Sequence, residues 1–184
     1  MNEEIKIPGG KELIDALASL KEAGIEKKMK VADFGCGRRG YFSLQAAKLV
    51  GPNGAVYAID ILPSALKSVE SLANLFNISN LKTIWANLEI EESTKLPNES
   101  MDLVLLNNVL FQTKNHNVIL KEAKRILKKG SNLLLTEWEK KETPFGPKEK
   151  IEKEEAKKKA EAVGLVFEKE FKPGPYHYSL VFKK

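Results

Sequence analysis

The chain has little cysteine, little arginine and no long apolar run. Its one cysteine, Cys36, excludes an internal disulfide and cannot supply a cysteine-rich metal site. No apolar stretch approaches the roughly 20 residues of a membrane-spanning helix, and the acidic start MNEEIKIPGG is not typical of a signal peptide. These absences predict a cytoplasmic protein that does not insert into membranes.

The basic residues are nearly all lysines. Lysine and arginine together number 30 against 25 acidic residues, for a formal net charge of +5, which allows nucleic acid as a partner. The only arginines are Arg38, Arg39 and Arg125. Because bidentate contacts to phosphates and bases favour arginine, the excess charge is better interpreted as a lysine-rich solvated surface than as a nucleic-acid interface.

Apolar runs that predict strands alternate along the chain with segments that predict helices. Such alternation indicates an α/β fold with a mostly parallel sheet and helices on both faces. The two closing strands are joined too closely for a crossover, so they are expected to pair antiparallel. The predicted strands cover residues 29–34, 55–60, 81–86, 101–107, 132–138, 165–171 and 177–184, and the predicted helices residues 11–23, 41–50, 63–76, 115–130 and 148–164.

The length of 184 residues favours a single domain. We expect a helical cap segment over residues 1–28 and a ligand-binding core over residues 29–138. A charged helix and the closing strand pair then occupy residues 139–184. No composition shift or linker divides these parts.

The stretch VADFGCGRRGYF, residues 31–42, places three glycines after the first predicted strand. Gly35, Gly37 and Gly40 have G-x-G-x-x-G spacing, which a plain glycine turn also shows. The second predicted strand ends in Asp60, however, 20 residues after Gly40. An acid in that position accepts hydrogen bonds from ribose hydroxyls, so the loop and the acid together predict nucleoside binding.

Asp33, two residues before the first glycine, discriminates between two nucleoside cofactors. A carboxylate there repels the pyrophosphate of a nicotinamide dinucleotide. It attracts the ammonium group of S-adenosylmethionine, by about 1 to 4 kcal/mol at 4 Å depending on the dielectric. The sign of this interaction favours S-adenosylmethionine, although Asp33 could also be a helix cap or a solvated strand end.

Residues 29–138 resemble the class I S-adenosylmethionine-dependent methyltransferases, and most closely their small-molecule and quinone-pathway group. The resemblance is carried by VADFGCGRRGYFSLQAAKLVGPNGAVYAIDI, MDLVLLNNVLF and LKEAKRILKKGSNLLLTEW. It implies a methyltransferase with a Rossmann-like, doubly wound, seven-stranded sheet in which one strand near the C-terminus is reversed.

The resemblance also implies the residues that bind the cofactor. Asp33 is expected to hold the methionine amino group, Asp60 the ribose hydroxyls, and Ile61 the face of the adenine. Two features depart from the family pattern: Asn87 stands where an acid is frequent, and Arg38 and Arg39 lengthen the glycine loop by one residue. The full expected set is Asp33, Gly35, Cys36, Gly37, Gly40, Asp60, Ile61, Asn87, Leu88 and Asn107.

The acceptor is expected to be a small molecule. The cofactor supplies an activated methyl group, so a catalytic base is optional; Glu137 and His177 are the weak candidates. Three alternatives stay open: a nicotinamide-dependent oxidoreductase, a non-catalytic S-adenosylmethionine-binding module, and an RNA methyltransferase. No metal is expected.

Overall fold

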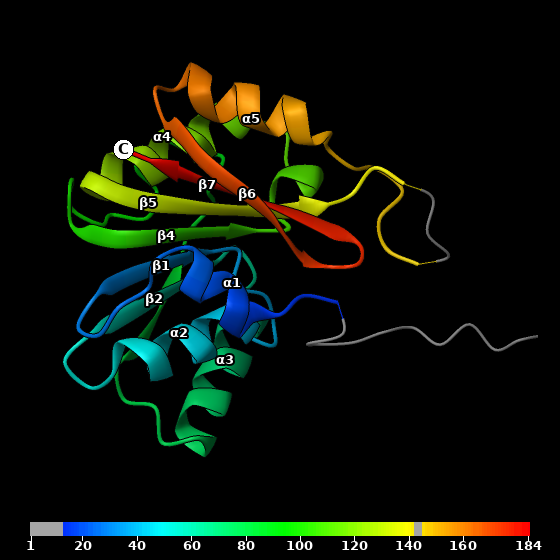
Figure 1. The fold of residues 1–184 in the computed structure, drawn as a ribbon. Helices are drawn as coiled ribbons and strands as arrows, with labels where there is room; N and C mark the ends of the chain where they lie inside the picture. Colours follow the sequence, from blue (N-terminus) through cyan, green and yellow to red (C-terminus); the bar gives the residue numbers. More distant parts are fainter. Residues whose placement is uncertain (1–12, 142–144) are drawn as a thin grey trace, which may run out of the picture.

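A computed structural model describes residues 13–141 and 145–184. Within them one sheet has the strand order β3-β2-β1-β4-β5-β7-β6 (Figure 1). Strands β1 to β5 pair in parallel, whereas β7 lies antiparallel to both β5 and β6. The predicted seven-stranded, mostly parallel sheet with one reversed strand near the C-terminus is therefore confirmed.

The strands and helices follow one another largely as the sequence predicts. The strands are β1 (Lys30–Phe34), β2 (Ala55–Asp60), β3 (Leu81–Trp85), β4 (Met101–Asn107), β5 (Leu127–Trp138), β6 (Val166–Gly174) and β7 (His177–Lys183). The helices are α1 (Ala16–Glu22), α2 (Tyr41–Val50), α3 (Pro63–Leu75), the 3-10 turn η2 (Leu110–Gln112), α4 (His116–Ile126) and α5 (Lys153–Ala162).

Helices cover both faces of the sheet, with α4 and α5 above it and α1, α2 and α3 below it in Figure 1. Strand β4 shows why: Leu103 and Leu105 join the core beneath α1 and α2, while Val104 and Leu106 join the core beneath α4 and α5. All four are at most 1% exposed, and full burial stabilises each by about 1.5–3 kcal/mol. In the described part of the chain, no helix combines the length and apolarity that crossing a bilayer demands.

The first predicted helix starts later than expected. The helix predicted over residues 11–23 begins at Ala16, because the side chain of Asp15 caps it by accepting a hydrogen bond of 3.0 Å from the backbone N–H of Ala18. Its residues 11 and 12 lie outside the described part. Leu17, in the first turn of this helix, is 41% exposed.

The helix predicted over residues 115–130 ends early, at Ile126. Strand β5 starts at the next residue, because Leu127 pairs with Met101 at the amino end of β4. Gly130, the last residue of that predicted range, lies inside the strand. The strand predicted over residues 132–138 is therefore five residues longer at its start.

The charged helix α5 is shorter than the predicted range of 148–164. Along the helix, Glu155 Oε1 and Lys159 Nζ form an ion pair of 3.4 Å. Lys153 Nζ pairs with the Glu170 carboxylate on β6 at 2.9 Å. The helix thus attaches to the sheet partly through a surface ion pair between elements.

Candidate cofactor-binding site

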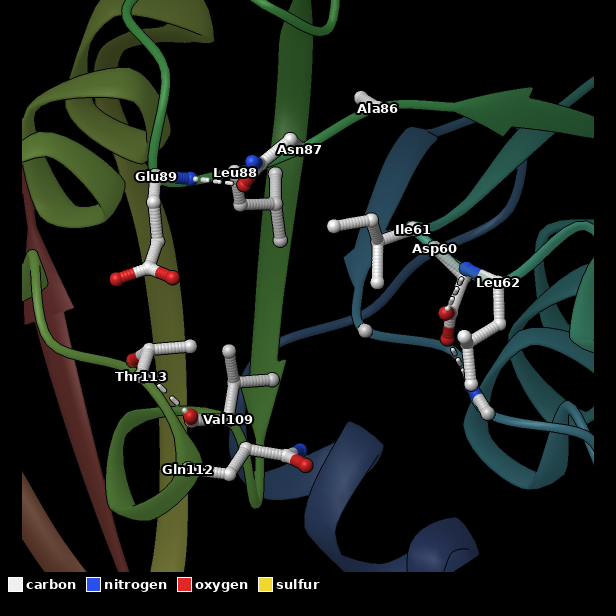
Figure 2. Close-up of a pocket in the computed structure, with 12 residues that line it drawn as sticks. Asp60, Ile61, Leu62, Ala86, Asn87, Leu88, Glu89, Val109, Gln112 and Thr113 are labelled. Carbon is white, nitrogen blue, oxygen red and sulfur yellow. Dashed lines mark hydrogen bonds between the residues drawn. The ribbon is translucent and has the colours of Figure 1, made fainter.

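A pocket of about 400 Å³ lies where the strand order reverses, at the carboxyl ends of β1, β2 and β4 (Figure 2). This is the edge at which open α/β sheets bind ligands, and the volume is within the range of about 300–1,000 Å³ for small-molecule sites. Four segments line it: the glycine loop through Gly35 and Gly37, residues 60–62 after β2, residues 86–89 after β3, and residues of 109–113 after β4.

Asp60 at the end of β2 is held in place by two backbone groups. Its Oδ2 accepts a hydrogen bond of 2.9 Å from the N–H of Gly37, and its Oδ1 accepts one of 2.9 Å from the N–H of Leu62. A carboxylate has about four lone-pair positions, so each oxygen can accept one more hydrogen bond. The fixed carboxylate therefore fits a ribose that presents two neighbouring hydroxyls.

Apolar side chains face each other across the pocket. Figure 2 shows Ile61 on one side and Leu88 and Val109 on the other. Ile61 is 49% exposed, an unusual position for its apolar side chain. The indole Nε1 of Trp85 donates a hydrogen bond of 2.8 Å to its carbonyl oxygen. The arrangement suits a flat, apolar-faced group such as a purine base.

Asn87 and Glu89 contribute polar groups to the pocket, beside these apolar side chains. The Asn87 Oδ1 accepts a hydrogen bond of 3.0 Å from the backbone N–H of Glu89. The Glu89 carboxylate accepts bonds of 2.7 and 2.8 Å from the N–H groups of Lys114 and Asn115, which hold its pKa below the usual range. Asn87 thus uses its acceptor oxygen locally, as an acid in that position could also do.

The first two glycines are required by the shape of the loop. Gly35 has φ +72°, and a Cβ there would lie 2.6 Å from Cγ2 of Val109. Gly37 has φ +63° and open space around that position, consistent with its place in the pocket lining. Gly40 serves another purpose: it precedes α2, and a Cβ there would lie 2.9 Å from Val69 of α3.

Asp33 lies behind the pocket rather than among its lining residues. It is 2% exposed, and its Oδ2 accepts a hydrogen bond of 2.5 Å from the Ser43 hydroxyl in the first turn of α2. Burial raises the pKa of Asp33 to about 6, partly opposed by the hydrogen bonds from Ser43. A cation close to this carboxyl group would therefore stabilise its ionised form.

Cys36 and the two loop arginines also stand apart from the pocket lining. Cys36 packs with Leu66 and Val69, and burial raises the pKa of its thiol. Arg38 and Arg39 are exposed, and the Arg38 guanidinium lies 3.4 Å from the Ser64 hydroxyl. The lengthened loop thus exposes the charges of both arginines to solvent.

Polar groups without partners gather at the end of β4. Both amide atoms of Asn107 and the Oδ1 of Asn108 are buried and have no hydrogen-bond partner among the described residues. Asn108 adopts a left-handed backbone, φ 56°, and its Nδ2 lies 3.3 Å from Nε2 of His177. Buried amide atoms normally have a hydrogen-bond partner, so the end of β4 is a candidate site of ligand contact.

His177 is held neutral in this arrangement. The residue is 1% exposed, and its ring centroid lies 4.2 Å from that of Trp138. Burial is the main cause that lowers the pKa of His177 to about 4, and Lys150 and Lys141 lower it further. At neutral pH the ring can exchange hydrogen bonds, but it is a weak base.

Glu137, the other candidate base, points into the protein. It is fully buried, and its Oε1 accepts hydrogen bonds of 2.9 and 2.6 Å from the N–H groups of Val109 and Leu110. Burial raises its pKa to about 8. Its carboxyl group does not line the pocket.

Six lining residues were not expected from the sequence: Leu62, Ala86, Glu89, Val109, Gln112 and Thr113. They lie in the segments after β2, β3 and β4, where neither apolar periodicity nor a glycine pattern marks them. The acid Glu89 two residues after Asn87 is the one signal that could have been used. Of the expected set, the pocket brings together Gly35, Gly37, Asp60, Ile61, Asn87 and Leu88.

Comparisons with known proteins agree with this geometry. A family model described as a methyltransferase domain matches residues 25–180. The ubiquinone/menaquinone biosynthesis C-methyltransferase UbiE of Pasteurella multocida is 33% identical over 119 residues, which is 64% of this chain and 43% of that protein. A demethylmenaquinone methyltransferase of Geobacillus is 26% identical over 119 residues, 65% of this chain and 49% of that protein. The matches thus span less than half the length of these curated relatives.

Solved structures show the same fold. The crystal structure of a SAM dependent methyltransferase from Aquifex aeolicus superposes with a TM-score of 0.87 at 25% identity. The superposition covers 96% of this chain and 93% of that chain.

Proposed function

The chain belongs to the class I S-adenosylmethionine-dependent methyltransferases, and we propose on this basis that it transfers a methyl group from that cofactor to a small-molecule acceptor. The observation that carries the proposal is the fixed carboxylate of Asp60, which keeps one acceptor position on each oxygen for a ribose hydroxyl. Asp60 lines the pocket together with the apolar side chains of Ile61, Leu88 and Val109, an arrangement that suits an adenosine.

Each part of the cofactor has a counterpart in the chain. Asp60 is proposed to hold the ribose, and Ile61 and Leu88 the two faces of the adenine. Asp33 is proposed to attract the methionine ammonium group, directly or through water, at the end of β1. When bound, the cofactor supplies the activated methyl group, and the protein supplies orientation and a site shielded from water.

We place the acceptor at the end of β4, against Asn107, Asn108 and His177. The unpartnered amide atoms there can donate and accept hydrogen bonds, which suits the hydroxyl or carbonyl oxygens of an acceptor. His177 is neutral in this site and is proposed to orient the acceptor through hydrogen bonding. A strong base is optional in this proposal, because the cofactor supplies an activated methyl group.

The acceptor is proposed to be a hydroxylated ring of the quinone-precursor kind. The relatives named above are quinone-pathway methyltransferases, which supports this class. Three aromatic side chains, Trp138, Phe145 and Tyr176, also gather beside His177, with ring-centroid distances of 6.4 and 4.9 Å from Phe145 to the other two. We further propose a cytoplasmic location and a single methyltransferase domain over residues 1–184.

Ligand titration followed by methyl transfer tests the proposal. Calorimetry is expected to show saturable binding of S-adenosylhomocysteine and none of NAD. Radiolabelled S-adenosylmethionine is then offered with a panel of hydroquinones, catechols and a control RNA, and label is expected in a hydroquinone. Saturable binding of NAD without binding of S-adenosylhomocysteine would favour an oxidoreductase. Binding of S-adenosylmethionine without methyl transfer to any acceptor would favour a non-catalytic module.

A further inference from the structure

The turn after β4 forms one wall of the pocket and packs directly on the glycine loop. Val109, Gln112 and Thr113 line the pocket from this turn. Cγ2 of Val109 occupies the space that a side chain on Gly35 would need, at 2.6 Å. A shift of Val109 therefore changes both the wall and the loop that faces the cofactor.

This turn lacks a local capping group. The 3-10 turn η2 has three residues, Leu110–Gln112, and its N-cap residue Val109 makes no side-chain capping bond. The preceding Asn108 is held in the left-handed region, φ 56°. The first N–H groups of any helical turn have no partner within the turn, so they need an acceptor from elsewhere in the protein.

We propose that Glu137 is a positioning residue that fixes this wall of the cofactor pocket. Its Oε1 accepts hydrogen bonds from the N–H groups of both Val109 and Leu110, at 2.9 and 2.6 Å. The inference rests on the proposed function, because the pocket is taken to hold S-adenosylmethionine.

The anchor is rigid because it belongs to the interior of the sheet. Glu137 is the penultimate residue of β5, which pairs with β4 on one side and β7 on the other. Its side chain is fully buried, and Oε2 has no hydrogen-bond partner within residues 13–141 and 145–184. Oε1 alone therefore accepts both hydrogen bonds, and a carbonyl oxygen at the same position could replace it.

The far end of the same segment is held by a second carboxylate. Glu89 accepts hydrogen bonds from the N–H groups of Lys114 and Asn115 and itself lines the pocket. Figure 2 shows its carboxylate directed toward the side of the pocket that carries Thr113. The two acids differ in burial, since Glu137 is fully buried and Glu89 is partly exposed. Glu137 is therefore the fixed end of the wall.

Two variants of Glu137 distinguish the effect of side-chain length from the effect of charge. Glu137→Gln keeps an acceptor oxygen at the same distance, whereas Glu137→Asp keeps the carboxyl group but withdraws it by one methylene. We expect Glu137→Gln to bind S-adenosylhomocysteine within about threefold of the wild type, and Glu137→Asp to bind at least tenfold more weakly, by calorimetry. Retained affinity in Glu137→Asp with loss in Glu137→Gln would show that charge matters instead, and would overturn the inference.

Glu122 offers a matched control. It is also buried, at 3% exposure, but it accepts hydrogen bonds from Thr94 and Arg125 away from the pocket. The same Gln and Asp substitutions there are expected to lower Tm while leaving the affinity within about twofold. Equal losses of affinity at Glu122 and Glu137 would indicate general destabilisation and contradict a positioning role.

A ligand-free measurement keeps this inference separate from the proposed function. Hydrogen exchange by NMR is expected to show protected amides at Val109 and Leu110 in the wild type and in Glu137→Gln, and faster exchange in Glu137→Asp. If the wild type fails to bind S-adenosylhomocysteine, the proposed function fails, whatever the exchange shows. Unchanged exchange in Glu137→Asp, with unchanged affinity, overturns the positioning role alone.

Discussion

The Ser43 hydroxyl donates a hydrogen bond of 2.5 Å to the carboxylate of Asp33, and both residues are buried. The bond joins the end of β1 to the first turn of α2, whose own N-cap residue, Gly40, has no side chain to offer. It favours the ionised form of an acid whose pKa burial raises to about 6. The site thus holds an acid that titrates close to neutral pH next to the expected methionine position.

The affinity for S-adenosylhomocysteine is expected to fall as pH drops below about 6. The ligand ammonium favours ionised Asp33, so protonation of this acid opposes binding by up to tenfold per pH unit. Calorimetry between pH 5 and 7.5 measures the effect. Asp33→Asn should bind weakly with no such pH dependence, and Ser43→Ala should move the onset to higher pH. An identical profile in Asp33→Asn would rule out the ammonium contact.

Asp60→Ala is expected to weaken S-adenosylhomocysteine binding at least 100-fold, or about 2.7 kcal/mol, because it removes the acceptors for two ribose hydroxyls. Circular dichroism should show the fold intact. Asp102→Ala is the control, since that acid contacts Lys30 and Lys128 near the amino end of β4, away from the pocket. Unchanged affinity in Asp60→Ala would refute the ribose role.

The stability of the protein should depend on pH through Glu137. Its pKa is about 8 in the folded protein against 4.5 ordinarily. Between these values the folded state holds a proton that the unfolded chain has released, so stability falls as pH rises and levels off above about 8. Glu137→Gln lacks this contribution, and its Tm relative to the wild type should rise between pH 5 and 8. Parallel Tm curves for the two proteins would contradict the raised pKa.

Alanine at the two lining glycines should separate folding from binding. Both positions carry a positive φ, which costs an alanine about 1–2 kcal/mol. Gly35→Ala also overlaps Val109 and should lose a further ~1–3 kcal/mol of unfolding free energy. Gly37→Ala has open space, so its smaller loss of stability should come with weakened ligand binding. Chemical denaturation and calorimetry measure both, and equal destabilisation of the two variants would be the contrary result.

The elements around the site could be predicted where each has a local cause. The bounds of α2, β2 and β4 agree with the predicted ranges because apolar runs end at glycines, a proline or a polar strand end. The end of α4 could not be predicted. Whether Leu127 continues the helix or starts β5 depends on its pairing with Met101, 26 residues earlier. Only the folded sheet brings those residues together.

The candidate site also contains some residues that sequence position predicts and some contacts that it does not. Asp60 ends β2 and Ile61 follows it, so their place at the sheet edge is given by sequence position, and both line the pocket. Asp33 lies one residue before the end of β1, yet its carboxylate accepts a hydrogen bond from Ser43, which sequence spacing does not reveal. The hydrogen bond from Val109 to Glu137 joins the turn after β4 to the end of β5, 28 residues later, and has no sequence signature. The roles of the expected site residues themselves stay predictions.

The bond between Glu137 and the turn after β4 also sets an order of assembly during synthesis. A chain that has grown as far as Trp85 already holds the glycine loop and Asp60, but not the wall or its anchor. The wall is held only once β5 has been made and paired, which requires most of the polypeptide. If the proposed cofactor site needs this wall, S-adenosylmethionine is expected to stabilise the fold only after residues up to Glu137 have been made.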